Sequence, residues 1–176
     1  MVEKKLGGAG LRGQSAGETA LCTVGKEGAG LTYRGYTIED LAANAQFEEV
    51  AYMLLYGALP TQGELDSYNQ KLMSLRGLPE DLKKTLEMIP ADTHPMDVMR
   101  TGCSMLGNLE PETDFDQQHE AADRLLAALP AIICYWYRYS HDGVRINTDT
   151  GEATLGGHFL KMLLDETPSD AHRAVM

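Results

Sequence analysis

Apolar residues recur at helical spacing in one segment after another from Thr37 onward, and this pattern constrains the fold more than any other feature of the chain. The longest such segment is 116–141, in which Leu125, Leu129 and Ile133 fall on one face of a helix. Short stretches that contain glycine or proline separate the segments. Because helix follows helix without an intervening strand, the sequence predicts a mainly α protein rather than an alternating α/β one.

Residues that cap helices stand where several of these segments begin. Thr61 and Glu64 have the spacing of a capping box, in which each side chain binds the backbone N–H of the other residue. Thr37 and Asp40 repeat this pattern with a shorter acid. His94 precedes a proline, which is tolerated in the first turn of a helix, so we expect His94 to help order a helix start. These positions predict where three helices begin.

The 116–141 segment has two further features. Pro130 lies in its middle and predicts a bend, because proline has no amide donor and clashes with the preceding turn. Aromatic side chains cover several sides of its C-terminal part, which is typical of a helix buried in a core or at a subunit contact. They are Tyr135, Trp136, Tyr137 and Tyr139.

Strand signals are confined to the N-terminal region. Residues 20–24 and 31–33 are β-prone and are separated by a glycine-rich stretch, so they predict one small β-hairpin. Residues 1–18 are rich in glycine and small polar side chains and indicate a flexible N-terminal segment. We therefore expect two regions: 1–36, with the flexible segment and the hairpin, and 37–176, with the helices.

The composition limits the classes of function. The formal net charge is −11, which argues against nucleic-acid binding because that function needs a basic face. No run of about 18 uncharged apolar residues is present, so we expect neither a membrane span nor a membrane partner. Cys22, Cys103 and Cys134 lie far apart without CxxC spacing, which indicates reduced, buried thiols in a cytoplasmic protein.

The five histidines have no spacing typical of a metal site, so we expect no metal. His141 ends the aromatic segment, where a cation suits the helix dipole. His158 is expected in the interior or at an interface. His119 and His172 lie among charged residues and are expected to be solvated.

Several motifs, in this order, resemble those of the N-terminal half of citrate-synthase-family enzymes. They lie in segments 30–38, which contains Tyr33-Arg34-Gly35-Tyr36, 47–51, 57–61, 75–79 and 93–102, which contains His94-Pro95-Met96. The resemblance extends from about Gly10 to Met176. It implies that the chain is the N-terminal part of the large helical domain of that family.

Other segments are similar to those of the bacterial 2-methylcitrate synthase subfamily. They are 20–25, 96–102, 135–141, 145–146 and 156–160. This resemblance implies a homodimeric enzyme that condenses propionyl-CoA with oxaloacetate and water to 2-methylcitrate and CoA, without a metal or redox cofactor. A citrate synthase that uses acetyl-CoA is the alternative within the family. A complete, non-catalytic helical dimerisation or scaffold protein is the alternative from another class.

The resemblance also implies that the reacting groups lie elsewhere. In the family, the aspartate that removes the α-proton, two catalytic histidines and the arginines that hold oxaloacetate belong to motifs of the second half, and these motifs do not occur here. The last helical pattern begins near Ser169 and reaches Met176 after barely two turns, so we expect a chain truncated at its C-terminus. We expect no catalytic residue among these 176 residues and no activity from them alone.

Two arginines are candidates for contact with the substrate. Some citrate synthases carry a basic residue near the CoA phosphates in the segment that corresponds to Arg12. Arg76 stands at a helix end before Gly77 and is the second candidate. Its alternative role is that of a cation that interacts with the C-terminal end of that helix.

Overall fold

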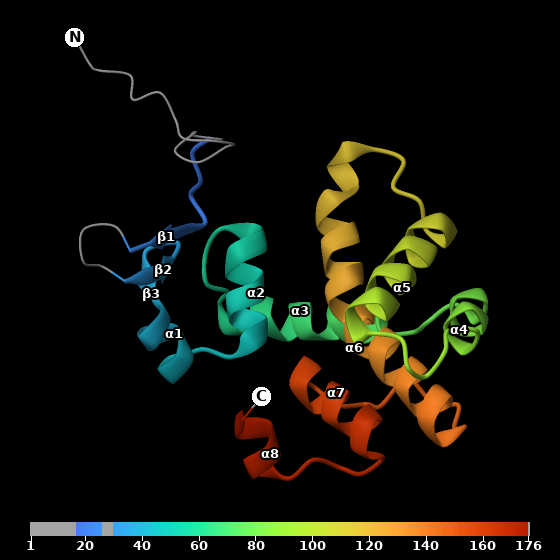
Figure 1. The fold of residues 1–176 in the computed structure, drawn as a ribbon. Helices are drawn as coiled ribbons and strands as arrows, with labels where there is room; N and C mark the ends of the chain where they lie inside the picture. The colour runs from blue at the N-terminus through green and yellow to red at the C-terminus, as the bar shows by residue number, and fades with distance from the viewer. Residues whose placement is uncertain (1–16, 26–29, 176) are drawn as a thin grey trace. The chain divides into compact units, whose positions relative to one another are not determined.

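The computed structural model describes residues 17–25 and 30–175, which belong to two compact units, 1–45 and 46–176. The described part of the first unit contains a small antiparallel sheet of strands β1 (Cys22–Val24), β2 (Leu31–Tyr33) and β3 (Tyr36–Thr37), followed by helix α1 (Ile38–Asn44) (Figure 1). In the register of β1 and β2, Cys22 lies opposite Tyr33 and Val24 opposite Leu31. The predicted hairpin is therefore present.

The short third strand was not predicted, and it depends on a tight turn. Arg34 and Gly35 both have left-handed backbone angles, with φ of 46° and 93°. Two consecutive residues with positive φ match the twist of a two-residue hairpin turn, so the chain reverses and Tyr36 lies opposite Tyr33. At the end of β3 the hydroxyl oxygen of Thr37 accepts a hydrogen bond from the backbone N–H of Asp40 at 3.1 Å, as the capping pattern predicts.

The regular elements among the described residues of the second unit are all helices, so the predicted mainly α class is confirmed. Its elements are α2 (Phe47–Tyr56), α3 (Gln62–Ser74), α4 (Glu80–Glu87), α5 (Pro95–Leu109), a short 3₁₀ turn (Phe115–Gln117), α6 (Gln118–Asp142), α7 (Leu155–Leu164) and α8 (Asp170–Val175). None of the helices in the described ranges combines the length and the apolar character that would allow it to cross a membrane.

The helix starts follow the local capping signals. Thr61 and Glu64 form the predicted capping box, in which the Glu64 carboxylate accepts a hydrogen bond from the backbone N–H of Thr61 at 2.8 Å. The Nδ1 atom of His94 accepts one from the backbone N–H of Met96 at 3.2 Å, so His94 caps α5 as expected. These bonds satisfy amide groups that a helix cannot pair internally.

Helix α6 is the centre of the main hydrophobic core. It packs against α4, α5 and α7, and Ala128, Ala131 and Ile132 on α6 are fully buried in this core. Trp136 is 2% exposed and donates a hydrogen bond to the carbonyl of Ile89, which confirms its predicted burial. The axis of α6 changes direction between its two halves in Figure 1, in agreement with the bend predicted at Pro130.

One sequence expectation for the cysteines is wrong. Cys134 is buried and Cys103 is half-buried, but Cys22 is exposed on β1. A strand of three residues with little packed against it leaves its side chains in contact with water. All three thiols are free.

Gly102 allows α5 to approach α6 closely, and we expect Gly102→Ala to destabilise the protein. A Cβ atom at this position would lie 2.5 Å from Cγ2 of Ile132. Such overpacking costs about 1–3 kcal/mol of unfolding free energy. Gly107→Ala is the matched control on the same helix, since nothing lies within 4 Å of its added Cβ. Urea unfolding should show a loss for the first variant and none for the second; equal effects would contradict the close contact.

Candidate functional site

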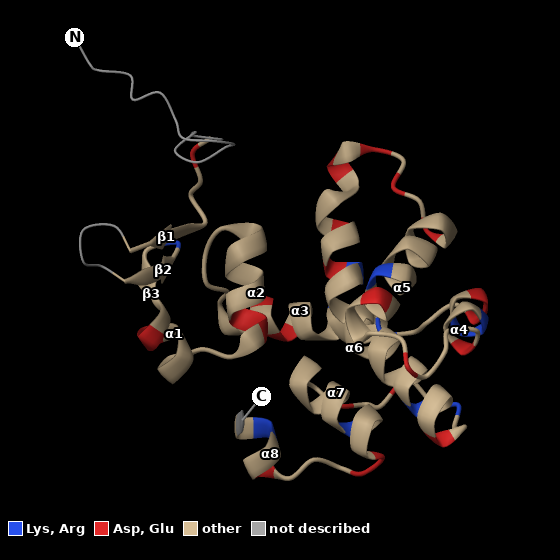
Figure 2. Ribbon diagram, viewed as in Figure 1, with Lys and Arg blue, Asp and Glu red and all other residues tan. Residues whose placement is uncertain are grey.

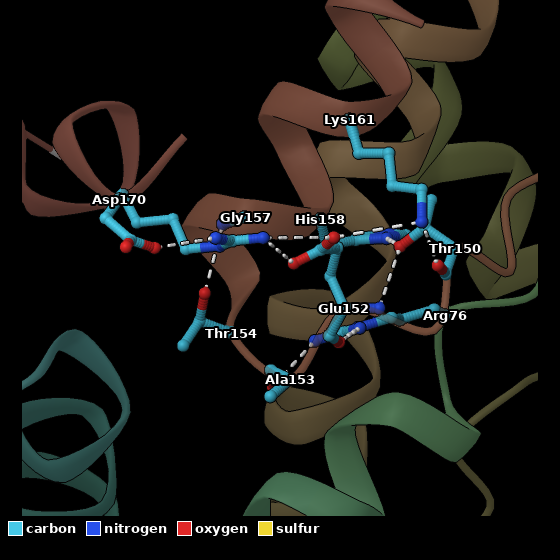
Figure 3. Close-up of polar contacts among 10 residues, drawn as sticks. Arg76, Thr150, Glu152, Ala153, Thr154, Gly157, His158, Lys161 and Asp170 are labelled. Atoms are coloured by element: carbon cyan, nitrogen blue, oxygen red, sulfur yellow. Dashed lines mark hydrogen bonds and ion pairs between the residues drawn. The ribbon is translucent and has the colours of Figure 1, made fainter. Parts of the chain in front are cut away.

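Of the two arginines predicted to contact a substrate, Arg12 lies outside the described residues. Arg76 follows the C-terminal end of α3 and is only 2% exposed. Its guanidinium group donates hydrogen bonds to the carbonyl oxygens of Glu152 at 2.5 Å and Ala153 at 3.4 Å (Figure 3). Burial lowers the pKa of Arg76, although the charges of Glu48, Asp149 and Glu152 act in the opposite direction. Contact of either arginine with a substrate stays a prediction.

The loop that Arg76 binds leads into α7, and two side chains of α7, those of His158 and Lys161, form hydrogen bonds with this loop. The hydroxyl of Thr150 and Nδ1 of His158 are 2.9 Å apart, and the Lys161 ammonium donates to the Thr150 carbonyl at 2.8 Å (Figure 3). His158 is fully buried. Burial, with a smaller contribution from the charge of Arg76, lowers the pKa of His158 to about 3. His158 is therefore an interior neutral imidazole, which is one of the two placements expected.

Glu152 links this loop to α8. Its carboxylate lies 3.2 Å from the Arg173 guanidinium and 3.7 Å from the Lys161 ammonium. Gly157 lies close beside it, because a Cβ atom there would be 3.0 Å from a Glu152 carboxylate oxygen. The backbone carbonyls of this loop therefore accept hydrogen bonds from Arg76, while the Glu152 carboxylate pairs with Lys161 and Arg173.

Charged side chains of other helices bind both ends of α7. Glu48 of α2 is 2% exposed and accepts a hydrogen bond from the backbone N–H of Leu155 at 2.6 Å. At the other end, Arg138 of α6 donates to the carbonyl of Leu163 at 3.2 Å. A negative charge at the N-terminus and a positive charge at the C-terminus both stabilise the helix dipole. Sequence reasoning missed Glu48, because a glutamate in the first turn of a helix is commonplace.

A second buried carboxylate belongs to Asp123 of α6, which is fully buried. It accepts hydrogen bonds from the hydroxyl of Tyr68 at 2.9 Å, from the hydroxyl of Tyr56 and from the Lys71 ammonium at 2.5 Å. The hydrogen bond with Asp123 raises the pKa of Lys71. One feature of the sequence indicates this cluster. Asp123 stands four residues before Ala127, so this acidic residue falls on the buried face of α6, where it needs polar partners.

An open hollow of about 500 Å³ lies beside the Asp123 cluster. Its lining includes Tyr52 and Tyr56 of α2 and Thr61, Tyr68 and Lys71 of α3. The tyrosine rings pack on one another, with centroids of Tyr52 and Tyr68 5.3 Å apart. The hollow is thus lined by three tyrosine rings, and Lys71 and Glu64 also contribute to its lining.

The remaining histidines lie at the surface or near helix ends. His119 is exposed and stacks on Tyr56, and His141 near the end of α6 stacks on Tyr137. His172 is exposed on α8, as expected. Within residues 17–25 and 30–175, no group of three or more His, Cys, Asp or Glu residues is placed to hold a metal ion.

Three buried polar side chains among the described residues connect separate segments of the chain. Glu48, Asp123 and His158 are each hydrogen-bonded to another part of the chain. Figure 2 shows acidic and basic residues on the same helices, in keeping with the many ion pairs. This arrangement can orient helices, although the buried Nε2 atom of His158 has no hydrogen-bond partner among the described residues.

Comparisons with known proteins agree with one another. The family model described as "Citrate synthase, C-terminal domain" matches residues 10–176. The 2-methylcitrate synthase of Shewanella oneidensis is 66% identical over 173 residues, which are 98% of this chain and 46% of that protein. The citrate synthase structure from Thermotoga maritima has a TM-score of 0.76 and 31% identity, over 98% of this chain and 44% of that one.

A third match concerns the fold alone. Citrate synthase from Thermoplasma acidophilum, in a ternary complex with carboxymethyl coenzyme A and oxaloacetate, has a TM-score of 0.84 at 22% identity, over 93% of this chain and 44% of that one. The chain spans about half the length of the curated relatives it matches.

Replacing the Asp123 carboxylate should strongly destabilise the protein. In Asp123→Asn the neutral amide oxygen replaces a buried carboxylate that accepts from three donors, and the half-exposed Lys71 loses its ion-pair partner. We therefore expect a loss of about 1–3 kcal/mol in the free energy of unfolding. Asp81→Asn is the control, because Asp81 pairs with Lys84 on the surface, and it should leave the stability nearly unchanged. Chemical denaturation measures both. A loss no larger for Asp123→Asn than for the control would show that the cluster does not hold the helices together.

Acid should destabilise the protein through His158. Its pKa of about 3 in the folded state lies below the ordinary value of 6.5. The unfolded chain therefore binds a proton first as the pH falls, so stability is lost from about pH 6.5 down to about pH 3. Between pH 7 and pH 5 this group should account for about 2 kcal/mol.

The measurement is denaturant unfolding at both pH values for the wild type and for His158→Gln. The two proteins differ only at residue 158, so the difference between their pH dependences isolates the imidazole. His172→Gln, at an exposed position, should retain the wild-type dependence. An unchanged pH dependence in His158→Gln would contradict a neutral buried His158.

Proposed function

Because this chain belongs to the citrate synthase family, we propose that it is part of an acyl-CoA:oxaloacetate condensing enzyme whose acyl substrate is propionyl-CoA. The observation that carries the proposal is the 66% identity to a 2-methylcitrate synthase over 98% of this chain. The identity to the Thermotoga maritima citrate synthase is 31% over the same share.

The proposed reaction joins the α-carbon of the thioester to the carbonyl carbon of oxaloacetate. A carboxylate must remove the α-proton while a hydrogen-bond donor stabilises the enolate oxygen, and hydrolysis then releases CoA. Among the described residues, the buried carboxylates are those of Glu48 and Asp123, and both accept hydrogen bonds within the chain. The buried His158 is bonded to Thr150 through Nδ1, and its Nε2 is enclosed in the interior without a hydrogen-bond partner among the described residues. We therefore assign the described residues a framework role and the chemistry to groups that the family motifs place elsewhere.

The framework role rests on particular contacts. Glu48 and Arg76 fix the start of α7 and the loop before it, while Asp123 fixes α2 and α3 on α6. A condensing site needs its groups held within a fraction of an ångström, which requires such a rigid support. The proposal includes a homodimer and a cytoplasmic location; the free thiols of all three cysteines support the latter.

Acetyl-CoA is the competing acyl substrate, since the matched structures are named citrate synthases. A graft tests this choice. The aligned segment of the Shewanella oneidensis 2-methylcitrate synthase is replaced by this chain, and CoA release is measured with oxaloacetate and either propionyl-CoA or acetyl-CoA. We expect activity with propionyl-CoA within about tenfold in kcat/KM of the native relative, a difference of roughly 1.4 kcal/mol in transition-state stabilisation.

The matched control is the same graft made with the corresponding segment of the Thermotoga maritima citrate synthase. Its lower identity to this chain should impair packing against the rest of the Shewanella protein, so activity should fall further. A folded graft of this chain that prefers acetyl-CoA would favour the citrate synthase alternative. A folded graft without any activity would favour the non-catalytic scaffold alternative.

The 176 residues by themselves should release no CoA in an oxaloacetate-dependent manner. Each missing acid, base or oxyanion donor typically costs on the order of a hundredfold or more in rate, so the loss of all of them leaves only background. The assay uses propionyl-CoA and oxaloacetate with a preparation whose mass is verified. Release at an ordinary enzymic rate would mean that the reacting groups lie within this chain.

A further inference from the structure

We draw no further inference here: the strongest candidate, the tyrosine-lined hollow between α2 and α3 beside the Lys71–Asp123 ion pair, carries nothing, because the hydroxyls of Tyr56 and Tyr68 and the Lys71 ammonium are already bonded to Asp123 and nothing in the described residues shows what covers it.

Discussion

Two adjacent charges on α6 join the helices of the second unit. Asp123 accepts hydrogen bonds from side chains of α2 and α3, and its neighbour Arg124 donates to Glu110 after α5 and to the carbonyls of Leu75 and Gly77 after α3. Both side chains lie largely out of water, so the loss of the hydrogen-bond partners of either one would cost folding free energy. Their bonds therefore favour one arrangement of α2, α3 and α5 around α6 over looser alternatives that apolar contacts alone would allow.

The same principle governs α7. Glu48 and Arg138 come from different helices and bind opposite ends of α7, each with the sign of charge that the helix dipole favours. Arg76 adds bonds to the loop before α7, and its positive charge helps to keep His158 neutral. Apolar contacts supply the driving force for packing, and these polar bonds determine which packing is reached.

The use of buried polar bonds to select one helix packing also bears on function. The chain belongs to the citrate synthase family and is 66% identical to a 2-methylcitrate synthase, and the activity that we propose for the protein is carbon–carbon bond formation. The buried side chains of Glu48, Arg76 and Asp123 bind other helices and loops of the same unit. A framework of this kind suits an enzyme whose reacting groups are carried by other segments, because those groups need a fixed support.

The sequence alone determined what depends on neighbouring residues. Apolar spacing identified the helices, and Thr61 and His94 marked helix starts correctly, because capping bonds span only a few residues. The partner of Glu48 lies 107 residues away and the partner of Arg76 lies 76 residues away. No local pattern encodes such pairs. The tertiary structure decided them, since burial removes these charges from water and each must then bind whatever group the packing of distant helices brings within reach.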